Sequence, residues 1–460
     1  MRARRRSRSA GPRSSGRGGM FAAFEVVPFR WLWAGALSGN SGRFAVILVA
    51  GWEAYRLGHH SSLWPGLVSM LLLVPSMFFG LVAGGVADRR NRARMAAAGQ
   101  LVNAASCAVA AVLTLVGQLD LVNLLVLTAV VGIGNSIQGP AWQAIVPELV
   151  GRERLLNASM SARIAQQGAE LTGPAIGTAV LTTAGPAAAF AACTCFYVAG
   201  LSMFWRIRHA VSTPDLAGPR QGILAPIAQG LSYVRRRAPL TTLLVWVGLH
   251  CSLTMASIGI LPAVATANLG GDAGAYGLLL TGFGLGSVLG PLVMMRLGGR
   301  TSAVPIPLLS GILSGLPLVS LGLVRDMGVD LASAASAGAA QAVFMAGIYS
   351  ANQSVSVDSM RGRVASVQLS LTTGAMGLAS IGWGALVALL APGIVLALPG
   401  ATFVLCCVPF ALRRGGLSVA IEANRWPAPA ALPPIADRPP DRHPPRRWRP
   451  AKRAGSGRSV

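Results

Sequence analysis

Lysine is nearly absent from this sequence: Lys452, in the C-terminal tail, is the only one among 39 Lys and Arg residues. A nucleotide-binding loop of the Gly-Lys-Ser/Thr kind needs a lysine for the phosphates, so no such ATP-hydrolysing loop is present. The His-x-x-x-His metal pair and the Gly-x-Ser-x-Gly nucleophile elbow are absent too. We therefore expect no enzyme activity, no bound metal and no cofactor.

Charged residues are scarce as well, at 12% of the chain, whereas hydrophobic residues make up 53% and the mean hydropathy is +0.57. A soluble domain could not bury this much apolar surface, so the composition predicts a polytopic membrane protein. The net charge of +24 lies in short clusters between apolar runs and in the tails, which favours membrane topology over nucleic-acid binding. The six cysteines follow no metal or disulfide spacing and are expected to be reduced.

Apolar stretches of about 20 residues, the length that crosses a bilayer, can be counted along the chain. Twelve such stretches are predicted to be transmembrane helices: 31–55, 63–86, 95–117, 121–142, 158–182, 186–206, 240–264, 275–296, 302–323, 329–350, 364–389 and 393–412.

The basic residues give these helices an orientation, because short cytoplasmic loops retain Lys and Arg. Arg56 and Arg325 are the only basic residues in the predicted outer loops, and Arg43 and Arg163 fall inside spans. All others lie in the tails, in the loops after even-numbered helices or at the span ends beside them. This pattern predicts a multi-pass protein of the plasma (inner) membrane with both termini in the cytoplasm.

The chain repeats itself at a shift of about 211 residues. Gly151-Arg152 precedes the fifth span as Gly362-Arg363 precedes the eleventh, and in this register Gly173 falls on Gly384. The repeat predicts two six-helix bundles, as in transporters that bind substrate between two halves.

This repeat divides the chain into two bundles, 25–206 and 240–412, joined by a polar cytoplasmic loop, 207–239. The tails, 1–24 and 413–460, are basic and rich in Pro, Gly and Ser, so we expect them to be disordered. Their charge predicts binding to anionic lipid headgroups.

One acid, Asp88, stands among arginines directly after the second apolar span. The C-terminal end of a helix carries the negative end of the helix dipole, which favours the arginines and disfavours a carboxylate. Asp88 is therefore expected to interact with a group elsewhere in the fold.

This segment resembles the signature between the second and third helices of the major facilitator superfamily. Gly84, Asp88, Arg89 and Arg92 match it, while Asn91 stands where the signature has glycine. The resemblance implies that the acid bridges to the start of the eleventh helix and closes the cytoplasmic side, with Arg89 and Arg92 holding the acid or its neighbours. The neighbouring Arg90 and Arg94 are interpreted as positive charges that fix the membrane topology. The same role is the alternative for Arg89 and Arg92.

A second segment is similar to the fifth-helix signature of exporting members of that superfamily. Gly173, Pro174 and Gly177 match, and Thr178 replaces a final glycine. Together with the runs at 157–158, 275–279 and 361–363, it resembles the enterobactin-exporter-like and multidrug efflux branch over residues 25 to 415. The resemblance implies an antiporter in which this helix seals the path between the halves; ordinary small-residue packing is the alternative.

Ionisable residues inside spans are the best candidates for chemistry, because each is costly if it faces lipid. Arg163 and Glu170 lie seven residues apart, on one face of the fifth helix. Glu170 is expected to face the central cavity and to carry a coupled proton or balance a cationic substrate, with Arg163 adjusting its proton affinity. A static ion pair is the alternative. Arg43 needs a cavity or a partner carboxylate, of which Glu170 is one.

The other polar residues in the spans are predicted to have structural roles or to line the cavity. Glu53 lies beside Trp52, Tyr55 and Arg56 near an outer helix end, where an interfacial role is expected. Gln167 and several further amides, with His250, are expected to make interhelical hydrogen bonds or to line the cavity.

These features predict a twelve-helix secondary transporter, a monomer that exports a small organic compound (a drug, siderophore or metabolite) by alternating access in exchange for protons. A proton-coupled importer of a metabolite is the first alternative, and a scaffold or receptor that has lost transport is the second. The expected partners are a small-molecule substrate, protons and membrane lipids.

Overall fold

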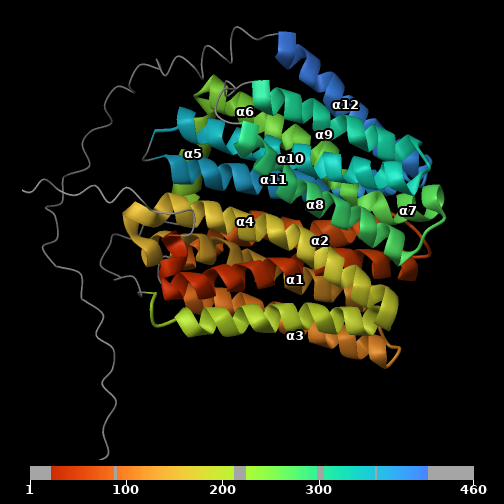
Figure 1. The fold of residues 1–460 in the computed structure, drawn as a ribbon, viewed down its shortest axis with the longest axis horizontal. Coiled ribbons are helices and arrows are strands. Elements are labelled where there is room, and N and C mark those ends of the chain that lie inside the picture. The colour runs from red at the N-terminus through yellow and green to blue at the C-terminus, as the bar shows by residue number, and fades with distance from the viewer. Residues whose placement is uncertain (1–21, 88–90, 212–223, 298–304, 358–359, 413–460) are drawn as a thin grey trace, which may run out of the picture.

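Helices form nearly all of the regular structure in the computed structural model, which describes residues 22–87, 91–211, 224–297, 305–357 and 360–412. Figure 1 shows them as two bundles lying side by side. Seven helical stretches of this described part are long and apolar enough to cross a membrane, judged by length and composition. The fold is therefore the predicted all-α membrane fold.

The first bundle begins with a 3-10 turn, Ala22–Glu25, and contains α1 (Val27–Leu57), α2 (Leu63–Ala87), α3 (Arg92–Leu115) and α4 (Leu121–Ile207). Gly151 and Gly185 interrupt α4 with φ angles of 71° and 81°, a left-handed conformation that glycine adopts without steric cost. They divide α4 into a first segment (121–150), a middle segment (152–184) and a last segment (186–207). With this division, each of the first six predicted spans is a helix.

The second bundle contains a helix for each remaining predicted span. The seventh span runs from α6 to α7 and is interrupted by a π-helical turn, Cys251–Met255, and a 3-10 turn, Ala256–Ile260. The helices are α6 (Ala238–His250), α7 (Leu261–Leu269), α8 (Ala273–Leu297), α9 (Pro305–Leu323), α10 (Met327–Val355), α11 (Arg361–Leu386) and α12 (Pro392–Leu412).

Two segments are more ordered than the sequence predicts. Residues 22–24 of the predicted tail belong to the 3-10 turn at Ala22–Glu25, where Ala23 is fully buried. The predicted loop 207–239 contains a helix, α5 (Leu224–Arg235). It lies on α11, since a Cβ at Gly230 would be 3.2 Å from the Arg363 Cβ, and the Tyr233 hydroxyl accepts a hydrogen bond from the Val357 N–H at 3.2 Å.

Equivalent hydrogen bonds support the internal repeat. In the first bundle the Ser41 and Thr172 hydroxyls lie 2.7 Å apart, joining α1 to the middle segment of α4. In the second bundle the Trp383 indole N–H donates to the Ser252 carbonyl at 2.7 Å, joining α11 to the π-helical turn. Ser252 and Trp383 each follow their counterparts by the 211 residues of the predicted shift.

Two helix pairs form the main contacts between the bundles. Between α2 and α11, the Ser380 hydroxyl donates to the Gly66 carbonyl at 2.9 Å, and a Cβ at Gly384 would lie 2.5 Å from the Ser62 carbonyl oxygen. Between the middle segment of α4 and α8, the Gln167 amide donates to the Ser287 carbonyl at 2.9 Å. Small residues and short polar side chains thus let these helices approach closely across the molecule.

The two ends of the bundles differ in charge. We call the end where α1, α3 and α11 begin the basic end, because Arg92, Arg237 and Arg361 lie there. The other end, which carries the hairpin between α1 and α2 and the one between α7 and α8, is the opposite end.

Candidate functional site

The segment that resembles the signature between the second and third helices falls at the basic end, between α2 and α3. Gly84 lies in α2, which ends at Ala87, but its surroundings are not described. Asp88 and Arg89 lie outside the described residues, so their predicted role as a gate stays a prediction.

Asn91 takes the place of the signature glycine and has a structural reason to do so. It is the N-cap of α3, where its side-chain oxygen accepts a hydrogen bond from the Arg94 N–H at 3.0 Å. Its amide donates to the carbonyls of Arg208 and Val211 at 2.9 and 2.8 Å. One buried side chain therefore caps α3 and ties it to the chain that leaves the last segment of α4.

Arg92 follows this cap and pairs with an acid of its own bundle. Its guanidinium lies 3.4 Å from the Glu148 carboxylate, on the first segment of α4. This contact joins α3 to α4 at the basic end.

The glycines of the fifth-helix signature let the middle segment of α4 pack against α1. A Cβ at Gly173 would lie 2.5 Å from the Ser41 carbonyl oxygen, and one at Gly177 would lie 2.9 Å from the Leu48 Cδ2. Any larger side chain at Gly173 would thus force the two backbones apart.

Pro174 has a different effect, because proline has no N–H to donate to the carbonyl four residues earlier, which is that of Glu170. The backbone stays helical through Pro174. The freed Glu170 carbonyl faces α8, where Gly284 lies against it so closely that a Cβ could not be accommodated. The Gly-Pro pair therefore places a carbonyl without its usual helical donor at the contact between the bundles.

The Glu170 side chain lies at the same junction. It is half-buried and close to the Ser287 side chain of α8, whose hydroxyl donates to the Gly284 carbonyl at 2.9 Å. The Gln167 amide, one turn earlier, bonds to the Ser287 backbone. Glu170 thus lies where α1, α4 and α8 meet.

Two arginines lie inside the same spans as this carboxylate or next to them, in different surroundings. Arg43 of α1 is half-buried, lies 5.4 Å from the centre of the Phe44 ring, and its charge attracts that of Glu170. Arg163 is exposed and stacks at 4.9 Å over the Tyr349 ring of α10. The structure therefore places Arg163 between the bundles, and Arg43 is the arginine whose charge acts on Glu170.

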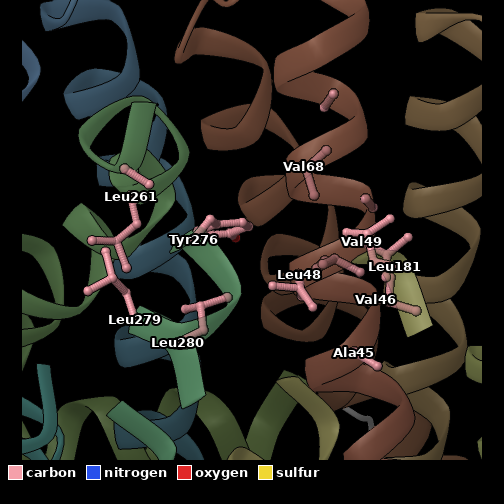
Figure 2. Close-up of a cluster of buried hydrophobic side chains, with 14 of the residues drawn as sticks. Ala45, Val46, Leu48, Val49, Val68, Leu181, Leu261, Tyr276, Leu279 and Leu280 are labelled. Carbon is pink, nitrogen blue, oxygen red and sulfur yellow. The ribbon is translucent and has the colours of Figure 1, made fainter. Parts of the chain in front are cut away.

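Contacts at the opposite end were not predicted. The Tyr55 hydroxyl lies 2.9 Å from the Thr266 hydroxyl of α7, and Trp52 stacks on Tyr276 of α8 with 6.2 Å between the rings. Figure 2 shows Tyr276 extending from the second bundle towards α1. The aromatic pair of α1 thus packs between bundles.

The interfacial prediction for Glu53 is accordingly wrong. Its side chain is buried, at 1% exposure, and pairs with the Arg56 guanidinium at 2.6 Å. The neighbouring Trp52 and Tyr55 contact the second bundle, so this end of α1 lies at the junction of the two bundles.

His250 is fully buried at the start of the break between α6 and α7. Its Nε2 lies 3.2 Å from the Ser314 hydroxyl, and its ring stacks on Phe344 at 4.0 Å. It is an interhelical contact within the second bundle. In the described part of the chain, no group of three His, Cys, Asp or Glu side chains could hold a metal ion.

Comparison with known proteins places this geometry in a family. Residues 18–438 match the family described as transmembrane secretion effector, of the major facilitator type. No curated protein matches the chain.

Solved structures of transporters share the fold at low sequence identity. A POT family transporter in complex with 5-aminolevulinic acid has a TM-score of 0.71 and 12% identity over 84% of this chain and 95% of that one. A peptide transporter POT variant in complex with alafosfalin has a TM-score of 0.69 and 14% identity, and the match covers 86% of this chain and 95% of that one. A bacterial homolog of the human lysosomal transporter Spinster, in an inward-facing and unoccupied conformation, has a TM-score of 0.63 and 13% identity. That match covers 90% of this chain and 100% of the other.

Proposed function

The chain belongs to the transmembrane secretion effector family of the major facilitator superfamily, and we propose that it exports a small organic compound in exchange for protons. Export is supported by the family description and by the exporter-like Gly173-Pro174 segment. The mechanism is alternating access, in which the two bundles rock about the α2–α11 and α4–α8 contacts.

The observation that carries this proposal is the position of Glu170. Its carboxylate lies close to Ser287 of the other bundle, and its backbone carbonyl, freed by Pro174, lies against Gly284. Gain or loss of a proton there changes the charge at the contact between the bundles. Protonation of one residue can therefore shift the equilibrium between two arrangements of the bundles.

The contacts of Tyr55 with Thr266 and of Trp52 with Tyr276 form a closure at the opposite end. We assign the matching closure at the basic end to Gly84, Asp88, Arg89 and Arg92. With the opposite end shut, the proposed cycle loads substrate from the basic end, which is the cytoplasmic side by the distribution of arginine.

Everted membrane vesicles test export directly, because an exporter accumulates its substrate inside them when their interior is acidic. We expect at least one of ethidium, fluorescein and norfloxacin, a cation, an anion and an amphoteric compound, to accumulate. Nigericin, which collapses the proton gradient, should abolish the accumulation. A protein that moves none of the three, or that accumulates one equally with nigericin present, would contradict proton-driven export.

Net movement out of acidic vesicles would instead indicate proton-coupled import. Vesicles without the protein provide the baseline for both directions.

A further inference from the structure

The charges near the centre of the first bundle indicate what kind of substrate the protein takes. Arg43, Arg163 and Glu170 lie well inside the apolar spans, on α1 and on the middle segment of α4. With Glu170 ionised these three residues leave one net positive charge, and with Glu170 protonated they leave two. Such charges are retained inside a membrane protein where they face a cavity or one another.

Arg43 has donors to spare. None of the hydrogen bonds found among the described residues uses its guanidinium, whose close contact is the Phe44 ring at 5.4 Å. Ser41 and Ala45, on the neighbouring face of α1, are covered by Gly173 of α4. The half-buried guanidinium thus lies beside this contact with its N–H donors unused. A planar guanidinium can bind a carboxylate through two parallel hydrogen bonds.

Glu170 lies on the side of its helix between two contact faces. Gly173 and Gly177 face α1, whereas Gln167 and Thr178 face α8. With 3.6 residues per turn, position 170 falls at the edge between these faces, and Arg163, two turns away, is on the same side, over Tyr349 of α10. Glu170 therefore faces the region between the bundles.

Arg43 and Glu170 attract each other, but no ion pair within 4.0 Å joins these two described residues. Two opposite charges that are not joined to each other, each half-buried, can accept a molecule that carries both charges. We propose that the exported compound is amphoteric, with an acidic group bound by Arg43 and an amine bound by Glu170.

The charges exclude simpler compounds as good substrates. A compound with only a cationic group would meet the net positive charge of Arg43 and Arg163. A compound with only an acidic group would bind best when Glu170 is protonated, so that proton and substrate would travel together. An amine competes with the proton for the Glu170 carboxylate, so it binds only after the proton has left. Proton and compound then occupy the site in turn, as exchange of one for the other requires. This inference rests on the proposed function and specifies its substrate.

Matched probes isolate the two charges. Norfloxacin and dansyl-lysine are amphoteric; their esters are cations, and their N-acetyl derivatives are anions. Fluorescence titration of the purified full-length protein should show at least about tenfold tighter binding for the amphoteric member of one triplet or both, since each charge-assisted contact is worth about this factor.

Variants assign each charge to its residue. Arg43→Gln should lower the affinity for the amphoteric and N-acetyl forms about tenfold and leave the ester unchanged, and Glu170→Gln should lower it for the amphoteric form and the ester only. Arg43→Lys and Glu170→Asp keep the charges and should keep the preference for the amphoteric probe. If they also lose binding, the loss in the Gln variants is due to misfolding and not to the missing charge. Arg206→Gln and Glu25→Gln, at the basic end, are the controls.

Equal or tighter binding of esters or anions, absence of binding by both amphoteric probes, or equal losses for all forms in Arg43→Gln would overturn the inference. The vesicle assay separates the two proposals: proton-driven transport of ethidium or fluorescein alone would support export and refute the amphoteric substrate.

Discussion

Asn91 illustrates how a single residue can depart from a family signature and gain contacts by doing so. Glycine at this position would allow the turn but would leave the Arg94 N–H and the carbonyls of Arg208 and Val211 without the partner that Asn91 supplies. Buried backbone groups without a partner destabilise a protein. The departure at Asn91 is thus explained by stability.

Replacement of Asn91 by alanine should lower the free energy of unfolding by about 2 kcal/mol, because a helix cap and two buried hydrogen bonds are lost together. Thermal unfolding of the detergent-purified protein would measure the effect. Gln118→Ala, an exposed amide beyond the other end of α3, serves as the control. Equal melting temperatures for both variants would show that the Asn91 contacts contribute nothing.

At the scale of helices, most elements could be predicted from the sequence, because a span of about 20 apolar residues is a local property. The repeat was equally readable, and the Ser41–Thr172 and Ser252–Trp383 bonds agree with its register. The π-helical turn at Cys251–Met255 carries no local signal, since its residues are as apolar as their neighbours.

The partners of the site residues were less predictable. Ser287 and Gln167 are 120 residues apart, and only the packing of α4 on α8 brings them together. The sequence predicts an interfacial Glu53 because Trp and Tyr near a helix end are typical of a lipid interface, whereas in the structure Trp52 and Tyr55 contact the second bundle. The contact between the Glu170 carbonyl and Gly284 likewise depends on tertiary structure.

The contact between α1 and the middle segment of α4 should be sensitive to a single methyl group. Gly173→Ala puts a Cβ against the Ser41 carbonyl oxygen, a backbone atom that cannot move without α1, and should destabilise the protein by about 2 kcal/mol. Gly168→Ala is the matched control, because its Cβ would meet only the Leu37 Cδ1 at 3.5 Å. Thermal unfolding of the two variants should differ; matching curves would refute close packing at Gly173.

At the scale of the whole molecule, two bundles in contact at the opposite end should separate there during transport. Tyr55→Cys and Thr266→Cys, in a protein whose six native cysteines are replaced, put one thiol on each side of the contact in which the two hydroxyls now lie 2.9 Å apart. The space left by the tyrosine ring separates the two thiols, so a linker is needed to join them. A short bifunctional thiol reagent should link them and reduce transport about tenfold or more, and reduction of a cleavable linker should restore it. Each single-cysteine variant is the control.

Full transport in the linked protein would show that this end does not open, and would refute alternating access about the observed closure.

The central claim is that Glu170 couples proton movement to compound movement, and it is tested most directly by measuring both fluxes at once. Proteoliposomes that contain a trapped pH-sensitive dye would report proton flux and compound flux together, for the wild type, Glu170→Gln and the control Glu25→Gln. We predict that the wild type and the control move protons against the compound, and that Glu170→Gln moves the compound only down its own gradient, with no proton flux. Proton exchange of wild-type magnitude in Glu170→Gln would contradict the central claim.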